Sequence, residues 1–181
     1  MEFINRNPKI IILSGKAQSG KNYCASIISD YYGELGLKTI VISYAFYLKV
    51  YAKNVLGWDG NEKTKPRGFL QQVGVELIKN NINPNMLVDR VIDDIKVYSY
   101  FYDVIVIGDA RFVDEIDVVK NNFSNVFVIH IDGKENSLTD AQRCHSTETG
   151  LDDYSDYDSV IMNNCSREEL KDKIYNVLEE V

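Results

Sequence analysis

Cysteine and histidine are scarce in this chain of 181 residues, which contains three cysteines and two histidines. Cys24, Cys144 and Cys165 are widely spaced and form no Cys-x-x-Cys pair, so neither a disulfide framework nor a zinc site is indicated. No apolar run approaches the length that spans a bilayer, and Met1 to Lys9 lack the apolar core of a signal peptide. We therefore expect a soluble protein of the cytoplasm, with no membrane partner.

Positive charge is also in short supply. The chain has 20 Lys and Arg against 27 Asp and Glu, which gives a formal net charge of −7. Surfaces that bind nucleic acids are strongly basic, so we expect no nucleic-acid partner. The hydrophobic content of 45% is sufficient for one well-buried core, and we expect residues 1–181 to form a single domain.

Apolar runs typical of buried strands alternate with helical patterns along the chain. These runs are Lys9–Ser14, Thr39–Ser43, Val104–Ile107, Val126–Ile131 and Ser159–Met162. The first four are nearly continuous Val and Ile, which indicates burial on both faces of a sheet. Each parallel pairing needs a crossover, usually a helix, so the alternation predicts a three-layer α/β fold with a five-stranded parallel sheet.

A glycine-rich loop directly follows the first apolar run and precedes a helical pattern. Its Gly-x-x-x-x-Gly-Lys spacing lets backbone N–H groups approach phosphate oxygens, while the helix N-terminus and Lys21 add positive charge. We predict that this loop binds a nucleoside triphosphate; the alternative is an ordinary glycine-rich turn. The predicted binding residues are Gly15, Lys16, Ala17, Gln18, Ser19, Gly20, Lys21 and Asn22.

Two positions are candidates for a magnesium site. The loop pattern usually places Ser or Thr after the lysine as a Mg²⁺ ligand, whereas Asn22 offers a carbonyl oxygen. Asp109 ends the third apolar run, and the carboxyl ends of neighbouring parallel strands open onto one crevice. We therefore expect Asp109 near the loop, holding Mg²⁺ directly or through water. The alternative is that Asp109 caps a helix that starts near Asp114.

The sixty residues between the second and third strands look helical and exceed the length of one crossover. We expect residues 46–100 to form a substrate-binding region. Within it, Arg67, Gln71 and Gly74 are spaced i, i+4, i+7 on one face of a helix. An apolar stripe on another face consists of Leu70, Val73, Leu77 and Ile78. Arg67 is either a solvated helix end or a contact to an anionic ligand.

Further basic residues follow the predicted strands. Arg111 lies two residues after Asp109, and its guanidinium suits bidentate recognition of phosphate. Lys49 follows the second strand, where it is either a surface lysine or part of an anion site. Residues 132–150 are placed to close over the phosphates as a lid, in which Arg143 would neutralise charge on a transferred phosphoryl group.

Neither histidine is expected to act as a catalytic base. Phosphoryl transfer from a nucleotide does not require one, so we interpret His145 as structural or substrate-orienting. His130 lies inside an apolar strand pattern and is predicted to be a packed core residue. Near the end of the chain, Ser166 with Glu169 three residues later is a capping-box pattern that predicts a final helix.

Together these motifs resemble, in order, those of the deoxynucleoside monophosphate kinases, P-loop enzymes that transfer the γ-phosphoryl of ATP to a deoxynucleoside monophosphate. The matching segments are residues 15–22, 45–49, 67–74, 109–112, 145–148 and 156–158. We expect catalysis by Lys21, Arg111 and Arg143. The resemblance implies Mg²⁺ with ATP as donor and an Asp where this chain has Asn22. It also implies an acceptor site that contains Lys49, Arg67, Gln71, Arg111 and Glu148.

Two alternatives remain open at this level. Phosphomevalonate kinases of animal type resemble this chain in the loop, in the Asp-x-Arg element and in residues 148–161, whereas residues 70–74 look more like the nucleotide kinases. A nucleotide-binding regulator without kinase activity would lack the second anion site that Lys49, Arg67 and Arg111 are expected to form. The sequence specifies neither the base accepted nor the oligomeric state, and a homodimer is compatible with it.

Overall fold

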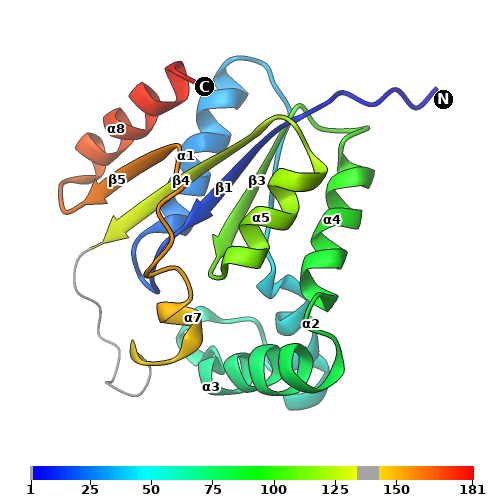
Figure 1. Ribbon diagram of the computed structural model, residues 1–181. Coiled ribbons are helices and arrows are strands. Elements are labelled where there is room, and N and C mark those ends of the chain that lie inside the picture. The colour runs from blue at the N-terminus through cyan, green and yellow to red at the C-terminus, as the bar shows by residue number, and fades with distance from the viewer. Residues whose placement is uncertain (1, 134–142) are drawn as a thin grey trace.

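The computed structural model describes residues 2–133 and 143–181, in which five parallel strands form one sheet (Figure 1). The strand order is β2-β3-β1-β4-β5, so the first strand lies at the centre. The strands are β1 (Lys9–Ser14), β2 (Thr39–Ile42), β3 (Val104–Ala110), β4 (Val126–Gly133) and β5 (Ser159–Asn163). The predicted α/β fold with a five-stranded parallel sheet is therefore confirmed.

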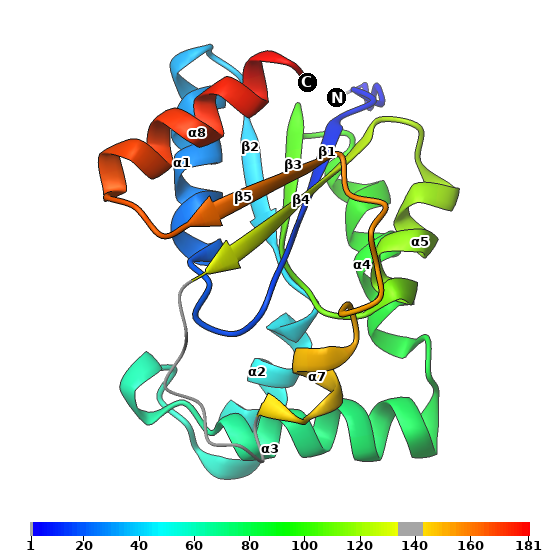
Figure 2. The ribbon, with the colours of Figure 1, turned by 60° about the vertical axis from the view of Figure 1, so that its left-hand side comes forward.

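Helices cover both faces of the sheet, which accounts for the nearly continuous Val and Ile of the central strands (Figure 2). On one face, α1 (Lys21–Glu34) and α8 (Arg167–Glu179) pack on Ile11, Leu13 and their neighbours. On the other face, α4 (Met86–Tyr98) and α5 (Val113–Asn122) pack on Ile10 and Ile12. Alternate residues of β1 thus belong to opposite cores.

Strand β3 is longer than the sequence predicted. The apolar run itself ends at Ile107 and the predicted strand ends at Asp109, whereas β3 continues one residue further to Ala110. The extension is set by the partner strand, because Ser14 of β1 pairs with Ala110 across a register shift. The register brings the carboxyl end of β3 beside the loop that follows β1.

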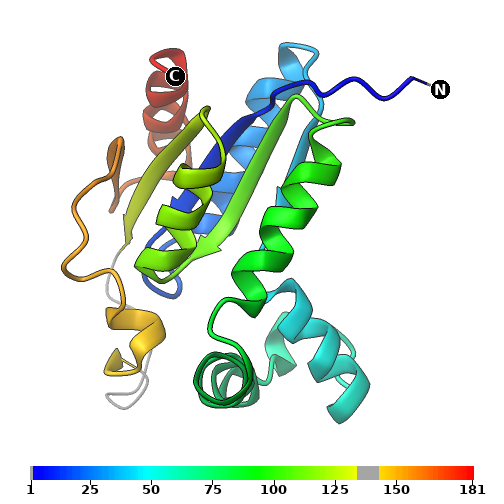
Figure 3. The same cartoon turned by 45° about the vertical axis from the view of Figure 1, so that its right-hand side comes forward.

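The region between β2 and α4 is helical, as predicted, and lies beyond the carboxyl ends of the strands (Figure 3). It comprises α2 (Ala45–Leu56), the short 3-10 helix η1 (Glu62–Thr64), α3 (Arg67–Gln71) and the π-helix η2 (Gln72–Ile82). Its small core contains Leu48, Ala52, Leu70 and Ile78.

One detail of the predicted apolar stripe was wrong. Leu70 and Ile78 are buried, but Leu77 is 49% exposed. The prediction assumed 3.6 residues per turn, whereas residues 72–82 form a π-helix, whose i→i+5 hydrogen bonds widen each turn. The wider turn rotates Leu77 away from the core.

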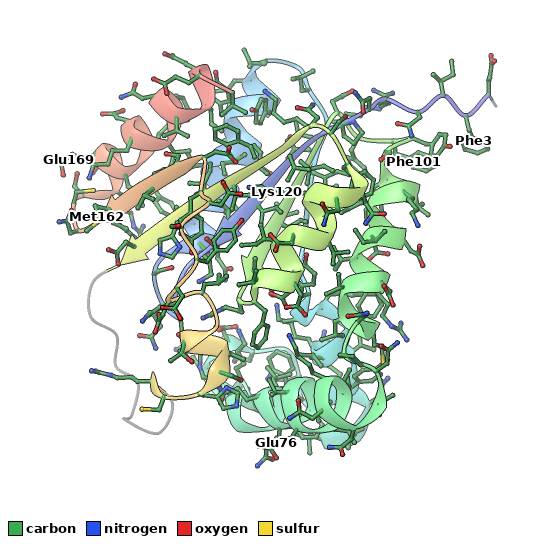
Figure 4. The ribbon with its side chains drawn as sticks, viewed as in Figure 1. Phe3, Glu76, Phe101, Lys120, Met162 and Glu169 are labelled. Atoms are coloured by element: carbon green, nitrogen blue, oxygen red, sulfur yellow. The ribbon has the colours of Figure 1, made fainter. Side chains whose placement is uncertain are left out.

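The two ends of the chain are fixed by local contacts. The ring of Phe3 lies edge-on to that of Phe101, with centroids 6.0 Å apart (Figure 4). At α8, Ser166 Oγ accepts a hydrogen bond from the Glu169 N–H at 3.2 Å, and Glu169 Oε2 accepts one from the Ser166 N–H at 2.9 Å. The predicted capping box is therefore confirmed. Among the helices of residues 2–133 and 143–181, none is both long and apolar enough to cross a membrane.

Candidate active site

A cavity of about 630 Å³ opens between the carboxyl ends of the central strands and the helical region. We call the side formed by loop residues 17–22 and the end of β3 the loop wall. The opposite side, formed by α2, α3 and η2, is the helical wall. Residues predicted from five separate segments thus face one space. Those that line it are Ala17, Gln18, Gly20, Lys21, Asn22, Lys49, Arg67, Gln71, Asp109, Arg111 and Glu148.

The loop wall depends on glycine where the sequence predicted it. Gly15 has a φ of +136°, and a Cβ at this position would collide with the carbonyl oxygen of Ile131 in β4. Gly20, with a φ of +99°, is the N-cap residue of α1. The loop therefore turns tightly against the sheet and enters the helix with backbone N–H groups at its N-terminus, the geometry that binds anions.

Lys21 is buried at the first turn of α1, with 6% of its surface exposed. Its ammonium donates hydrogen bonds to the carbonyl oxygens of Gly15 (2.8 Å) and Lys16 (2.7 Å). Burial, followed by the nearby charge of Arg111, lowers the pKa of Lys21 to about 7. The charged form of Lys21 is therefore disfavoured in the free protein, and a negatively charged ligand bound at the loop would stabilise it.

Asp109 lies beside the loop, as predicted, but it also caps a helix. Its two carboxylate oxygens accept hydrogen bonds from the N–H groups of Tyr44 (2.9 Å) and Ala45 (3.1 Å). The helix that it caps is α2, not the one near Asp114 that the sequence suggested as an alternative. Each oxygen keeps a second lone pair for a further ligand.

The ligand atoms around Asp109 suit a magnesium ion that is held partly by phosphate and water, and not a metal ion that is coordinated by protein side chains alone. Within residues 2–133 and 143–181, no three His, Cys, Asp or Glu side chains gather into a metal cluster. Mg²⁺ is usually held by one or two carboxylates together with phosphate oxygens and water, so a single carboxylate beside a phosphate loop is an adequate protein contribution. Asn22 is exposed at the same cavity and adds an amide oxygen.

Arg111 and Glu148 form an ion pair beside the loop. The Arg111 Nη1 atom lies 2.8 Å from Glu148 Oε1 and also donates to the Thr147 carbonyl oxygen at 3.2 Å. Glu148 Oε2 accepts a hydrogen bond of 2.7 Å from the Ala17 N–H. Glu148 belongs to α7 (Ser146–Thr149), so this short helix connects the loop with the end of β3.

The helical wall presents three of the predicted acceptor residues. Arg67 lies 3.3 Å from Glu62 Oε1, and Gln71 Nε2 donates to Thr147 Oγ1 at 3.3 Å. Lys49 is half-buried and borders the same cavity. Arg67, Gln71 and Gly74 line one cavity, which agrees with the predicted shared face.

Arg143 and the predicted lid differ from the other candidates. Arg143 is exposed and is not among the described residues that line the cavity. Residues 134–142 of the predicted lid (residues 132–150) lie outside the described residues. The lid therefore stays a prediction.

Several residues of the site were not singled out from the sequence. Glu115 is buried, and its Oε2 accepts hydrogen bonds from the N–H groups of Arg111 (2.6 Å) and Phe112 (3.1 Å). Burial raises the pKa of Glu115 to about 8. No capping-box pattern marked Glu115 in the sequence, because the Phe112 side chain has no hydrogen-bond acceptor. Nor did a local signal point to Lys79, whose Nζ lies 3.9 Å from the centroid of the Phe112 ring.

His130 is not a packed core residue, so that prediction was wrong. It is half-buried, its Nδ1 lies 3.0 Å from Ser14 Oγ, and its ring centroid lies 4.6 Å from that of Tyr157. The reason is that it points to the opposite face of β4 from the buried Ile129 and Ile131, where it lines a second cavity of about 170 Å³. His145 has a structural place, because its Nδ1 accepts a hydrogen bond of 3.2 Å from the Thr147 N–H at the start of α7.

The sheet order, the loop after β1 and the cavity at the strand ends give this chain the fold of the P-loop kinases. Solved structures of similar fold include APS kinase of Mycobacterium tuberculosis in complex with AMPPNP and APS, with a TM-score of 0.54 and 12% identity over 95% of this chain and 98% of that one. Shikimate kinase of Acinetobacter baumannii in complex with shikimate gives a TM-score of 0.52 and 13% identity over 96% of this chain and 94% of that one. At these identities the likeness concerns the fold.

A comparison of the sequence with models of protein families identifies the family of this chain. The model of the family described as deoxynucleotide monophosphate kinase matches residues 39–174, three quarters of the chain. The chain belongs to this family, which confirms the resemblance, and it is a phosphotransferase. The match includes Lys49, Arg67 and Arg111 and begins after the loop. A comparison with curated proteins gave no match.

Proposed function

We propose that this enzyme transfers the γ-phosphoryl group of ATP to a deoxynucleoside monophosphate, which yields ADP and the deoxynucleoside diphosphate. The observation that supports this function best is that two sets of cationic groups border one cavity. The loop and Lys21 form one set, and Lys49, Arg67 and Arg111 form the other. A nucleotide-binding regulator needs only the first set, whereas transfer between two phosphates needs both.

On the donor side, the backbone N–H groups of residues 15–21 and the Lys21 ammonium hold the β- and γ-phosphates of ATP. Binding restores to Lys21 the charge that its burial disfavours, because phosphate oxygens replace the loop carbonyls as its partners. Asp109, directly or through water, and Asn22 would hold Mg²⁺, which neutralises charge on the phosphates when bound.

On the acceptor side, Arg111, Lys49 and Arg67 orient the phosphate of the deoxynucleotide, with Gln71 and Glu148 beside them. The acceptor phosphate is already ionised near neutral pH, since its second pKa is about 6, so no protein base is needed. One of its oxygens attacks the γ-phosphorus in line, and the bond to the β–γ bridging oxygen breaks to release ADP. Positioning and charge neutralisation supply the acceleration, to which Arg143 contributes from the lid.

The test is to incubate the protein with Mg·ATP and each common deoxynucleoside monophosphate separately, while ADP release is followed. We expect one or more of these acceptors to increase the rate strongly over ATP alone. A reaction with phosphomevalonate in place of the nucleotide distinguishes the alternative acceptor that the sequence left open. Equal ADP release with and without every deoxynucleotide would exclude the proposed function.

A further inference from the structure

The cavity contains a carboxylate, that of Glu148, among the groups that are proposed to bind phosphates. Glu148 has a side chain that is only 6% exposed, and both of its carboxylate oxygens are engaged. One accepts the N–H of Ala17 in the loop, at 2.7 Å. The other pairs with Arg111, at 2.8 Å. A carboxylate therefore occupies two of the groups that are expected to bind phosphates.

The position of Glu148 is fixed by the packing of α7 and the residue after it. The Thr147 carbonyl oxygen accepts a second hydrogen bond from Arg111 at 3.2 Å. The helix is followed by Gly150, where a Cβ would lie 2.7 Å from the Arg111 carbonyl oxygen. The segment thus approaches Arg111 more closely than any larger residue would allow. This close fit holds the carboxylate between the loop and the guanidinium.

The same carboxylate cannot serve both partners while phosphates occupy them. A backbone N–H donates one hydrogen bond at full strength, so a phosphate oxygen at Ala17 competes directly with Glu148 Oε2. An acceptor phosphate at Arg111 competes in the same way with Oε1, and the added negative charge repels the carboxylate.

From these contacts we propose that Glu148 is a positioning residue that couples the two substrates. In the free enzyme its carboxylate stands in for phosphate, keeping Arg111 and the loop in place. A substrate that displaces the carboxylate from one partner also removes it from the other. Binding of either substrate therefore favours binding of its partner, and this coupling rests on the proposed two-phosphate function.

The reciprocal nature of such coupling gives a quantitative signature. If the acceptor tightens binding of the ATP analogue by some factor, the analogue must tighten binding of the acceptor by the same factor. Because the shared element is one carboxylate, neutralising it should raise the affinity for the ATP analogue in the absence of acceptor. It should also reduce the coupling factor to one, so that the acceptor no longer changes the affinity for the analogue. An ordinary structural residue would lower both affinities or leave them unchanged.

The experiment measures binding of Mg·AMPPNP by calorimetry, with and without the most active deoxynucleoside monophosphate. Glu148→Gln retains the shape of the side chain and an oxygen for the Ala17 N–H, but removes the charge. We expect it to bind Mg·AMPPNP alone about tenfold more tightly than the wild type, since a charged hydrogen-bonding competitor is lost. The acceptor should tighten binding by the wild type several-fold and leave the variant's affinity unchanged.

Asp152→Asn is the matched control. Asp152 also places a carboxylate beside the loop, 2.9 Å from Lys16 Nζ, but this pair is largely solvent-exposed. Its neutralisation should change affinity for Mg·AMPPNP by less than twofold. Equal tightening in both variants would mean that general electrostatics, and not the position of Glu148, is responsible.

Two results would overturn the proposal. One is unchanged or weaker binding of Mg·AMPPNP by Glu148→Gln, and the other is a coupling factor that survives in the variant. Glu148→Ala, assayed in the same way after its thermal unfolding has been compared with that of the wild type, provides a second neutral variant. Neither result would alter acceptor-dependent ADP release by the wild type, so the proposed function is tested separately.

Discussion

The loop wall of the cavity rests on the central strand of the sheet, whereas the helical wall extends beyond the sheet's end and has a small core of its own. On the loop side, Gly15 and Lys21 are fixed by backbone contacts to β4 and to the loop itself. On the helical side, Lys49 and Arg67 are only partly buried, and η2 follows an unusual π-helical path. In terms of the proposed function, the donor phosphates would be bound mainly by a rigid backbone, while the acceptor would be chosen by side chains that can change.

If this contrast is correct, the largest effect comes from the loop cation. Lys21→Met should lower kcat/KM by at least about 10³-fold, because no other group replaces its charge at the transferring phosphoryl. The free energy of unfolding of the variant should also increase, by on the order of 1 kcal/mol, because a buried ammonium is removed. The variant should therefore unfold at a higher temperature than the wild type. Steady-state kinetics and thermal denaturation measure the two effects, and retention of near-normal kcat/KM would contradict the donor-side assignment.

The same lysine gives the free protein a characteristic pH dependence. The folded pKa of about 7 lies below the unfolded value of roughly 10.4, so between these values the unfolded chain binds the extra proton. The contribution of Lys21 to the free energy of unfolding therefore increases as pH rises from about 7 to 10. Urea titrations should show the stability of the wild type rising relative to that of Lys21→Met over this range; a constant difference would count against the lowered pKa.

Next in size is the effect of a methyl group on the loop backbone. Gly15→Ala should destabilise the protein by about 3 kcal/mol, because it adds strain at positive φ to a collision with Ile131. Gly36→Ala is the matched control, with a φ of +76° and no atom near the added Cβ. It should cost only about 1 kcal/mol. Equal losses in urea unfolding would show that the close approach of the loop to β4 is unimportant.

The acceptor side should respond more selectively. Arg111→Ala is expected to lower kcat/KM for the deoxynucleotide by about 10²-fold, while affinity for Mg·AMPPNP changes less than about fivefold. Arg6→Ala serves as the control, since Arg6 pairs with Asp103 at the opposite end of β3. Equal losses of donor and acceptor affinity would refute the division of the cavity into two sides.

The smallest expected effect comes from a substitution in the helical wall, and it tests whether side chains there can move to accept an added methyl group. A Cβ at Gly74 would lie 2.9 Å from Leu48 Cδ1, a flexible side-chain end that can move. Gly74→Ala should therefore cost about 1 kcal/mol or less and chiefly change the KM for the acceptor. Gly68→Ala, with no atom within 4 Å, should stabilise its helix by about 0.5 kcal/mol. A loss at Gly74 as large as that at Gly15 would remove the proposed contrast between the walls.

The parts of the molecule that the sequence predicted are those with a local cause. Strand β1 is a run of Ile and Leu, and the loop after it is recognisable because glycine and lysine must stand at fixed positions beside a phosphate. The π-helix was not predicted, because no residue pattern distinguishes its i→i+5 hydrogen bonds from those of an α-helix. Likewise, the extension of β3 to Ala110 depends on its pairing with β1.

The contacts of Glu148 were beyond sequence reasoning for a related reason. The hydrogen bond from Ala17 to Glu148 joins residues 131 positions apart. The motif order suggested that Glu148 belongs to the acceptor site, but only the folded chain brings its carboxylate to the loop as well. His130 was misassigned because an apolar strand pattern does not reveal that one face of the strand borders a cavity while the other face is buried.

Helix α2 is anchored at the end nearest the loop wall. Asp109 caps its first N–H groups, and the buried Tyr44 hydroxyl donates to the Glu115 carbonyl oxygen at 2.5 Å. At its far end, Val55 and Leu56 are 69% and 51% exposed. Changes in the length or surface of that end can therefore accumulate without shifting the atoms around Asp109, so this end of the helix can diverge between related proteins while the cavity keeps its geometry.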